Sequence, residues 1–261
     1  MDKVNQTLYI PLYGKSLVSQ KGVILKDGKA EEIWEKSQFP LKRKSKTKWL
    51  AYYLGMRSAV FDEWVKKERL TYPSAVVLHV GCGLDSRVLR VGEGDEAWFD
   101  VDLPSVIEER KRYYEETERY QMLSADLKNP SSLSALPSAE RGILLLEGVS
   151  MYLANDELRA ALAKIGAQFS NLSVLVDCYT PFAAKMSAIK NPVNDVGVYR
   201  TYGVASASVL EEGTGLTFVK EHEMTPRVLI DELAGKEKWL FKRLYAGRTA
   251  KKLYKLYEYE K

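Results

Sequence analysis

Short apolar runs alternate with amphipathic stretches along most of the chain. The runs lie at about 75–80, 97–101, 122–125, 142–146 and 173–177. Continuous apolar runs of this length are typical of strands buried on both faces of a parallel sheet. Between them, apolar residues recur at helical spacing. The alternation predicts a doubly wound α/β fold with a parallel sheet.

The sequence predicts a helix after Leu84, and the amphipathic stretches predict four more in the first two thirds of the chain. One short helix covers 30–36, and a longer one covers 47–67, where apolar and aromatic residues repeat at helical spacing. A third begins at Pro104, a residue suited to a first helical turn, and continues to about residue 119. For the fourth, Asn155 is the expected N-cap.

The last third of the chain departs from this rhythm. Residues 180–212 contain prolines and glycines without a clean apolar period. The segment follows the fifth strand at the carboxyl edge of the sheet, where ligands bind in such folds, so we expect a lid insertion. Beyond it we expect a sixth strand at 216–222, helices at 226–234 and 236–250, and a final strand near 253–259.

A glycine turn follows the first predicted strand. Gly81 and Gly83 flank Cys82, and the second strand ends in Asp100 and Asp102. Glycines let the backbone approach a ligand closely, and a carboxylate one strand later can accept hydrogen bonds from ribose hydroxyls. The pattern therefore predicts a site for a nucleoside-containing ligand, without specifying its chemistry.

Composition narrows the class of protein. The chain has 261 residues, 28% of them charged, with a net charge of +4, which does not by itself suggest nucleic acid. No apolar run has the length of about 18–20 residues that spans a membrane. Cys82 and Cys178 form no disulfide framework, and the start of the chain lacks the apolar stretch of a signal peptide. We therefore expect a cytoplasmic protein with no nucleic-acid or membrane partner and with unknown oligomeric state.

Several motifs, in order, resemble the leucine carboxyl methyltransferase family, in particular its polyketide O-methyltransferase branch of the tetracenomycin type. The motifs are Val80-Gly81-Cys82-Gly83-Leu84-Asp85-Ser86-Arg87, Asp100-Val101-Asp102-Leu103-Pro104, Asp126-Leu127 and Glu147-Gly148-Val149-Ser150-Met151-Tyr152-Leu153. The segments Pro11–Ser16 and Met56–Asp62 also resemble that branch. The resemblance covers roughly residues 8–260. It implies a class I methyltransferase fold, Rossmann-like, that uses S-adenosylmethionine. The implied division is an N-terminal helical cap over 1–70 and a cofactor-binding core over 71–261 that carries the lid.

The resemblance also implies roles for individual residues. Gly81 and Gly83 would line the methionine part of the cofactor, Asp102 would take the ribose hydroxyls, with Asp100 as the other candidate, and Asp126 and Leu127 would frame the adenine. Glu147 would lie by the methionine amino group, Arg57 would reach the carboxylate, and Lys15 would assist it. Tyr152 would face the substrate, and we take it as the catalytic candidate.

These assignments imply methyl transfer to an oxygen of a small-molecule acceptor. A carboxylate is ionised at neutral pH and needs no base, whereas a hydroxyl needs one. His79 lies inside a strand and is expected to be a core residue, and His222 lies in or near the sixth strand, so scarce histidine favours an acidic acceptor. The resemblance implies that this acceptor is a polyketide-like molecule, methylated on a carboxylate or a hydroxyl. Tyr152, Tyr179 and Tyr199 are candidates to orient it.

Three alternatives remain open from the sequence. The acceptor could be a protein C-terminus, as in the leucine carboxyl branch. A non-catalytic protein could keep the cofactor pocket and act through contacts. A nicotinamide-dependent oxidoreductase could share the glycine turn, although Ser86 replaces its third glycine. The histidines and cysteines show no metal-ligand spacing.

Overall fold

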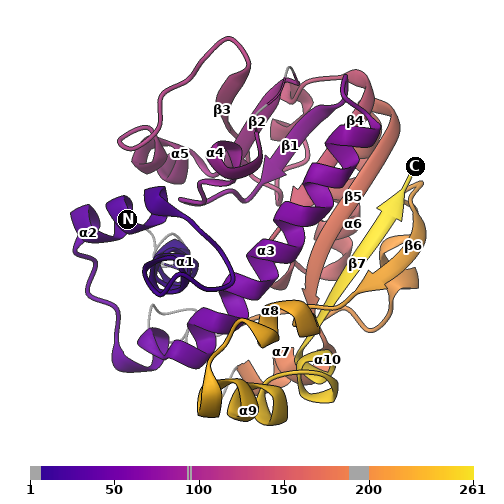
Figure 1. Cartoon of the computed structure of the whole chain (residues 1–261). Coiled ribbons are helices and arrows are strands. Elements are labelled where there is room, and N and C mark those ends of the chain that lie inside the picture. Colours follow the sequence, from indigo (N-terminus) through magenta and orange to yellow (C-terminus); the bar gives the residue numbers. More distant parts are fainter. Residues whose placement is uncertain (1–6, 93, 95, 188–199) are drawn as a thin grey trace.

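The computed structural model describes residues 7–92, 94, 96–187 and 200–261. Within these residues, seven strands form one sheet in the order β3-β2-β1-β4-β5-β7-β6 (Figure 1). The strands are β1 (Val76–Val80), β2 (Trp98–Asp102), β3 (Tyr120–Ser124), β4 (Ala139–Leu146), β5 (Phe169–Tyr179), β6 (Thr217–His222) and β7 (Tyr254–Glu260). Every strand expected from the sequence is present. Strands β1 to β5 are parallel as expected, whereas β7 runs antiparallel to both β5 and β6, so the complete sheet is mixed.

Helices cover both faces of the sheet. The helices on one face and around it are α1 (Tyr9–Gln20), α2 (Gly28–Ser37), α3 (Lys48–Thr71), α4 (Arg87–Val91), α5 (Pro104–Arg110), α8 (Arg227–Asp231), α9 (Gly235–Leu244) and α10 (Arg248–Leu253). Helix α6 (Asn155–Gly166) and the short turns η3 (Ser132–Ala135) and η6 (Ala207–Leu210) pack on the other face. The apolar strands are therefore buried from both sides, which explains their continuous hydrophobic runs.

The N-terminal helices share a core with the sheet. Side chains of α1, α2 and α3 pack in one hydrophobic cluster with residues of β1, β2 and β4. Helix α3 crosses the front of the sheet in Figure 1, and α1 lies beyond the tips of β1 and β2. This arrangement brings the N-terminal segment to the carboxyl ends of the parallel strands, where ligands bind in open α/β sheets.

Most expected helices are present, and α2 and α3 confirm the helices expected at 30–36 and 47–67. Three details of the expectation are wrong. Helix α5 ends at Arg110 instead of near residue 119, because the chain turns there and buries Tyr114, whose hydroxyl donates to the Leu84 carbonyl (3.0 Å). The N-cap of α6 is Ala154, whose amide donates to Glu157, and Asn155 is the first helical residue.

The third correction concerns the C-terminal helices. The helix expected at 236–250 is two helices, α9 and α10, separated at Gly247, which has φ +57°. Such a conformation breaks a right-handed helix and favours glycine. Helix α1 was not expected as a helix; Pro11 lies in its first turn, where proline removes no intrahelical hydrogen bond.

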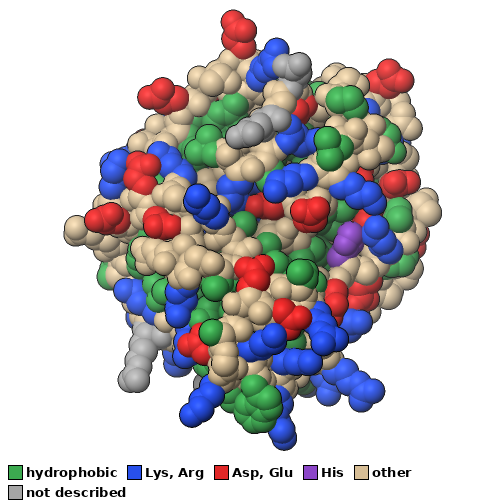
Figure 2. Space-filling model, viewed as in Figure 1, with side chains coloured by type: hydrophobic (Ala, Val, Ile, Leu, Met, Phe, Trp, Pro, Cys, Tyr) green, Lys and Arg blue, Asp and Glu red, His purple; other side chains and the backbone are tan. Residues whose placement is uncertain are grey.

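Charged side chains of both signs are intermixed over much of the face shown in Figure 2, while Lys and Arg gather toward its lower edge. That edge corresponds to the region of α9 and α10 in Figure 1. Among the residues that the structure describes, no helix combines the length and apolar character needed to cross a membrane.

Candidate active site

A cavity of about 680 Å³ lies at the carboxyl ends of the parallel strands. We divide it into two halves by the elements that line it and name each half after the role that the sequence leads us to expect. The cofactor half is formed by the residues that follow β1 to β4, together with Lys15 and Arg57 from the N-terminal helices. The acceptor half is formed by 7–12, by Leu50 and Leu54 of α3, by η4 (Ser150–Tyr152) with Leu153, and by parts of 179–202 and 253–254.

The turn after β1 passes close beneath the residues that follow β4. Gly81 has φ +71°, and a Cβ atom there would lie 2.0 Å from Cγ2 of Val149. Glycine is therefore required both by the backbone conformation and by the space. The next turn residue, Gly83, donates its amide to Oδ2 of Asp102 (2.8 Å). Gly81 and Gly83 both line the cavity.

Asp102 and Asp100 have different surroundings at the end of β2. Asp102 lines the cavity, and its two oxygens accept from the amides of Gly83 and Leu103, while burial raises its pKa. Asp100 is fully buried beneath the site, where it accepts from Trp98 (2.9 Å) and from the Tyr120 hydroxyl (2.8 Å) and pairs with Arg110. Of the two candidate acids, Asp102 is therefore the one that a ligand in the cavity can reach.

Glu147, at the end of β4, is held between two buried arginines. Its Oε1 accepts from Nε of Arg57 (3.0 Å), and its Oε2 accepts from Arg87. Burial raises the pKa of Glu147, but the two guanidinium groups outweigh this effect and lower the pKa to about 2. The carboxylate therefore stays ionised and oriented at neutral pH, and its low pKa makes it a weak base.

Arg57 is 4% exposed and so is not a surface cation of α3. Besides Glu147 it donates from Nη1 to Oδ2 of Asp177 (2.9 Å). Lys15, 3% exposed, pairs with Asp85 (2.9 Å) across the turn after β1. Both cations line the cavity, so the structure brings Lys15 and Arg57 to the cofactor half from outside the sheet.

The adenine candidates Asp126 and Leu127 follow β3 and also line the cavity. Asp126 accepts from the Lys128 amide (2.9 Å), and its own amide donates to Ser132 (3.0 Å). These bonds fix the turn at the far end of the cofactor half, next to Asp102 in the sheet order. All eight cofactor candidates therefore line one cavity.

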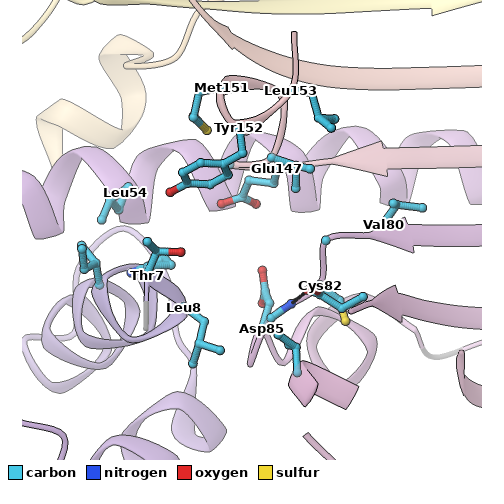
Figure 3. Close-up of a pocket in the computed structure, with 18 of the residues that line it drawn as sticks. Thr7, Leu8, Leu54, Val80, Cys82, Asp85, Glu147, Met151, Tyr152 and Leu153 are labelled. Carbon is cyan, nitrogen blue, oxygen red and sulfur yellow. Dashed lines mark hydrogen bonds between the residues drawn. The ribbon is translucent and has the colours of Figure 1, made fainter. Parts of the chain in front are cut away.

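The acceptor half is mainly apolar and aromatic. Tyr152 extends from η4 across the cavity toward Thr7 and Leu54, with Glu147 beside it (Figure 3). Burial raises the pKa of the Tyr152 phenol, so at neutral pH the phenol stays protonated. The rings of Tyr179 and Tyr254 meet edge to face with centroids 4.7 Å apart. Tyr199, the third tyrosine candidate, lies outside the described residues.

Neither histidine is placed to act as a base. His79 is buried 3.2 Å from Asp100 and 3.0 Å from Arg87, and burial lowers its pKa. Although it lines the cavity, it is buried among these groups, as expected for a core residue. His222 pairs with Glu258 (2.5 Å) on β6 and β7, away from the cavity.

The sequence analysis missed the supporting charges. Asp177, which is fully buried two residues before the end of β5, binds Arg57 and accepts from the Gly148 amide (2.6 Å). Arg87 joins Glu147 to Asp62 (2.7 Å) on α3. A signal existed for Asp177, because it ends a predicted strand at the same sheet edge. No local pattern pairs Arg87 with α3.

The fold defines the class of protein. The seven-stranded mixed sheet with helices on both faces is the Rossmann-like fold of class I methyltransferases. The chain is similar to magnesium protoporphyrin IX methyltransferase from Synechocystis PCC 6803, solved with S-adenosylhomocysteine, with TM-score 0.54 and 10% identity, covering 88% of this chain and 93% of that chain. It is also similar to a putative sarcosine dimethylglycine methyltransferase from Galdieria sulphuraria, with TM-score 0.50 and 9% identity, covering 79% and 87% of the two chains.

The sequence identifies the family. The leucine carboxyl methyltransferase family model matches residues 3–166, and the chain belongs to this family. It is 28% identical over 241 residues to the tetracenomycin polyketide synthesis O-methyltransferase TcmP of Streptomyces glaucescens, covering 91% of this chain and 89% of the relative. It is 33% identical over 109 residues to the S-adenosyl-L-methionine-dependent methyltransferase dpfgK of Gibberella zeae, covering 38% and 36%.

The chain is therefore an S-adenosylmethionine-dependent O-methyltransferase, as the motifs predict. The residues of the cofactor half fit this cofactor, because they supply cations, carboxylates and a glycine turn at one cavity. The nicotinamide-dependent alternative is not supported by the relatives, which are methyltransferases.

Proposed function

We propose that the enzyme methylates a carboxylate of a small, largely apolar, polyketide-like acid. The observation that carries this proposal is the composition of the acceptor half, which combines apolar walls and phenols with no carboxylate or histidine among its described residues. The similarity to TcmP along 91% of the chain supports a small-molecule acceptor rather than a protein C-terminus.

The cofactor half is proposed to hold S-adenosylmethionine, which supplies an activated methyl group on a sulfonium. Asp102 would accept from the ribose hydroxyls with the lone pairs that Gly83 and Leu103 leave free. Asp126 and Leu127 would frame the adenine. Gly81 and Gly83 would face the methionine part, Glu147 would take its ammonium, and Arg57 with Lys15 would lie by its carboxylate.

The acceptor half has no described group that could remove a proton from a hydroxyl. Glu147, which lies beside Tyr152, is paired with two arginines, and these lower its pKa to about 2, so its carboxylate is a weak base. Burial raises the pKa of the Tyr152 and Tyr254 phenols, so they are donors at neutral pH. An acceptor carboxylate arrives already ionised and needs only orientation and exclusion of water.

Tyr152 is proposed to orient the acceptor through its hydroxyl, which projects into the cavity (Figure 3). Residues 1–70 would act as a cap and 180–212 as a lid over the core 71–261. The contribution of Ala183, Met186 and Tyr202 to the cavity wall supports the lid, and that of 7–12 supports the cap. We also propose a cytoplasmic location, in keeping with two buried cysteines that are free of disulfides.

The test is methyl transfer from deuterium-labelled S-adenosylmethionine to two aromatic probes of one skeleton, 2-naphthoate and 2-naphthol. Mass spectrometry before and after mild alkali separates a labile methyl ester from a stable ether. We expect the ester from the acid and little ether from the naphthol. Preferential formation of the ether would overturn the proposed carboxylate chemistry.

A further inference from the structure

Residues 202–204 of the lid segment are held against the core next to the acceptor half. The Tyr202 amide donates to the Met151 carbonyl (2.9 Å), and the Val204 amide donates to the Tyr179 carbonyl (2.8 Å). Between them, Gly203 passes so close to Thr180 that a Cβ atom there would lie 2.6 Å from its backbone. The backbone beside Arg200 is therefore held against η4 and the end of β5.

Arg200 lines the acceptor half from this fixed segment. Its guanidinium lies over the ring of Tyr202, 5.0 Å from the centroid. The side chain is exposed, so it stands at the rim of the cavity and not in its floor. A guanidinium stacked on an aromatic ring keeps its donor edges available for a planar anion.

The other cations that line the cavity either form buried ion pairs or lie in the cofactor half, unlike Arg200. Lys15 pairs with Asp85, and Arg57 pairs with Glu147 and Asp177. Lys128 lies beyond Asp126, on the adenine side of the cofactor half. Among the described residues of the acceptor half, Arg200 is the one charged side chain, and no ion pair is found for it there.

We propose that Arg200 is the residue that recognises the acidic group of the acceptor. This inference rests on the proposed function and adds a specificity residue to it. As an acid enters, its carboxylate would meet the donor edge of Arg200, and its apolar skeleton would lie against the aromatic and aliphatic wall. A neutral acceptor of the same shape would gain only the second contact. Arg200 acts in binding and carries no proton in the reaction.

The experiment compares 2-naphthoate with its neutral isostere 2-naphthamide by calorimetry, on protein saturated with S-adenosylhomocysteine. We expect the wild type to bind the acid at least ten times more tightly than the amide. Arg200→Gln should reduce this ratio to about two or less, and Arg200→Lys should retain part of it. Lys185→Gln removes one exposed charge from α7 (Pro181–Ser187) of the same segment, outside the cavity, and should leave the ratio unchanged.

A charge reversal sharpens the test. Arg200→Glu should bind protonated 2-naphthylmethylamine more tightly than 2-naphthoate, because the recognising charge has changed sign. An Arg200→Gln protein that keeps the tenfold preference would overturn the inference, and so would a wild type that binds acid and amide equally or binds neither. The titration with S-adenosylhomocysteine separates the proposed function from the inference about Arg200. If the wild type does not bind S-adenosylhomocysteine, the proposed cofactor site is wrong. If Arg200→Gln binds S-adenosylhomocysteine normally and keeps its preference for the acid, only the role of Arg200 is wrong.

Discussion

The two halves of the cavity are built in different ways. In the cofactor half, Asp102, Asp126 and Glu147 follow or end parallel strands of one sheet. Buried cations pair with Asp85, Glu147 and Asp177 around them. The acceptor half is assembled from helices and loops far apart in the chain, with aromatic and aliphatic walls. A cofactor of fixed structure favours prearranged charges, while an acceptor site needs shape and a few polar groups that fix orientation.

The largest effect is expected from the removal of Arg87, the buried arginine that joins α3 to the end of β4. It contacts Asp62, Ser58 and His79 and pairs with Glu147. Arg87→Ala would remove one of the two buried arginines from each of Glu147 and Asp62, so we expect a loss of about 3–5 kcal/mol in the free energy of unfolding, measured in urea.

The matched control is Arg112→Ala, since the Arg112 side chain is 71% exposed and pairs with Glu109 at helical spacing. An exposed pair of this kind contributes about 0–1 kcal/mol. Equal, small losses for both variants would mean that the buried charges of the cofactor half do not stabilise the fold.

The second prediction compares the loss of an acid in the cofactor half with the loss of an acid on the surface. If Asp102 accepts from the ribose hydroxyls, Asp102→Ala should lose about 2–3 kcal/mol of affinity for S-adenosylhomocysteine, since a hydrogen bond to a charged group contributes about 1.5–3 kcal/mol. Calorimetry gives the affinity. Asp156→Ala, an exposed acid in the first turn of α6, should bind like the wild type. Full affinity in Asp102→Ala would show that the wrong acid has been chosen.

The third prediction uses two glycines with the same backbone conformation. Gly81 and Gly213 both have φ +71°, but a Cβ atom at Gly213 would meet nothing within 4 Å, whereas one at Gly81 would meet Val149. Gly213→Ala should cost about 1–2 kcal/mol of stability from backbone strain alone. Gly81→Ala should cost about 1–3 kcal/mol more, from overpacking, and should also weaken binding of S-adenosylhomocysteine. Identical urea midpoints and cofactor affinities in the two variants would contradict the close approach.

The smallest expected effect lies in the acceptor half. Tyr152→Phe removes one hydroxyl that is proposed to orient the acceptor, worth about 1 kcal/mol, so the kcat/KM for methyl transfer should fall by roughly 5-fold. Affinity for S-adenosylhomocysteine should not change. Tyr245→Phe, outside the cavity, should leave both values as in the wild type. If Tyr152→Phe lowered the affinity for S-adenosylhomocysteine and left kcat/KM for methyl transfer unchanged, Tyr152 would belong to the cofactor half.

How much the sequence predicts also differs between the halves. Strand ends are adjacent in space whenever strands are parallel neighbours, so Asp102, Asp126 and Glu147 could be placed at one edge from their apolar runs alone. Lys15 and Arg57 required the family resemblance, because they reach the cavity through tertiary packing of α1 and α3. The pairing of Arg87 with Asp62 and Glu147 is equally non-local.

The acceptor half is less predictable for the same reason. Its wall combines Leu8, Leu54, Tyr202 and Tyr254, which come from four separate segments and carry no shared motif. The predicted helix lengths were wrong at two places. At Tyr114 a tertiary contact outweighs the local helix propensity, and at Gly247 a single glycine changes the backbone direction.

A crystal structure with bound S-adenosylhomocysteine is the most direct test of the division into two halves. The account predicts the ribose hydroxyls within hydrogen-bond distance of Asp102, the adenine beside Asp126 and Leu127, and the amino-acid end between Glu147 and Arg57. It also predicts that the space between Tyr152 and Arg200 stays free of the cofactor. A cofactor lying across Tyr152 and Arg200, with Asp102 out of reach, would contradict the account.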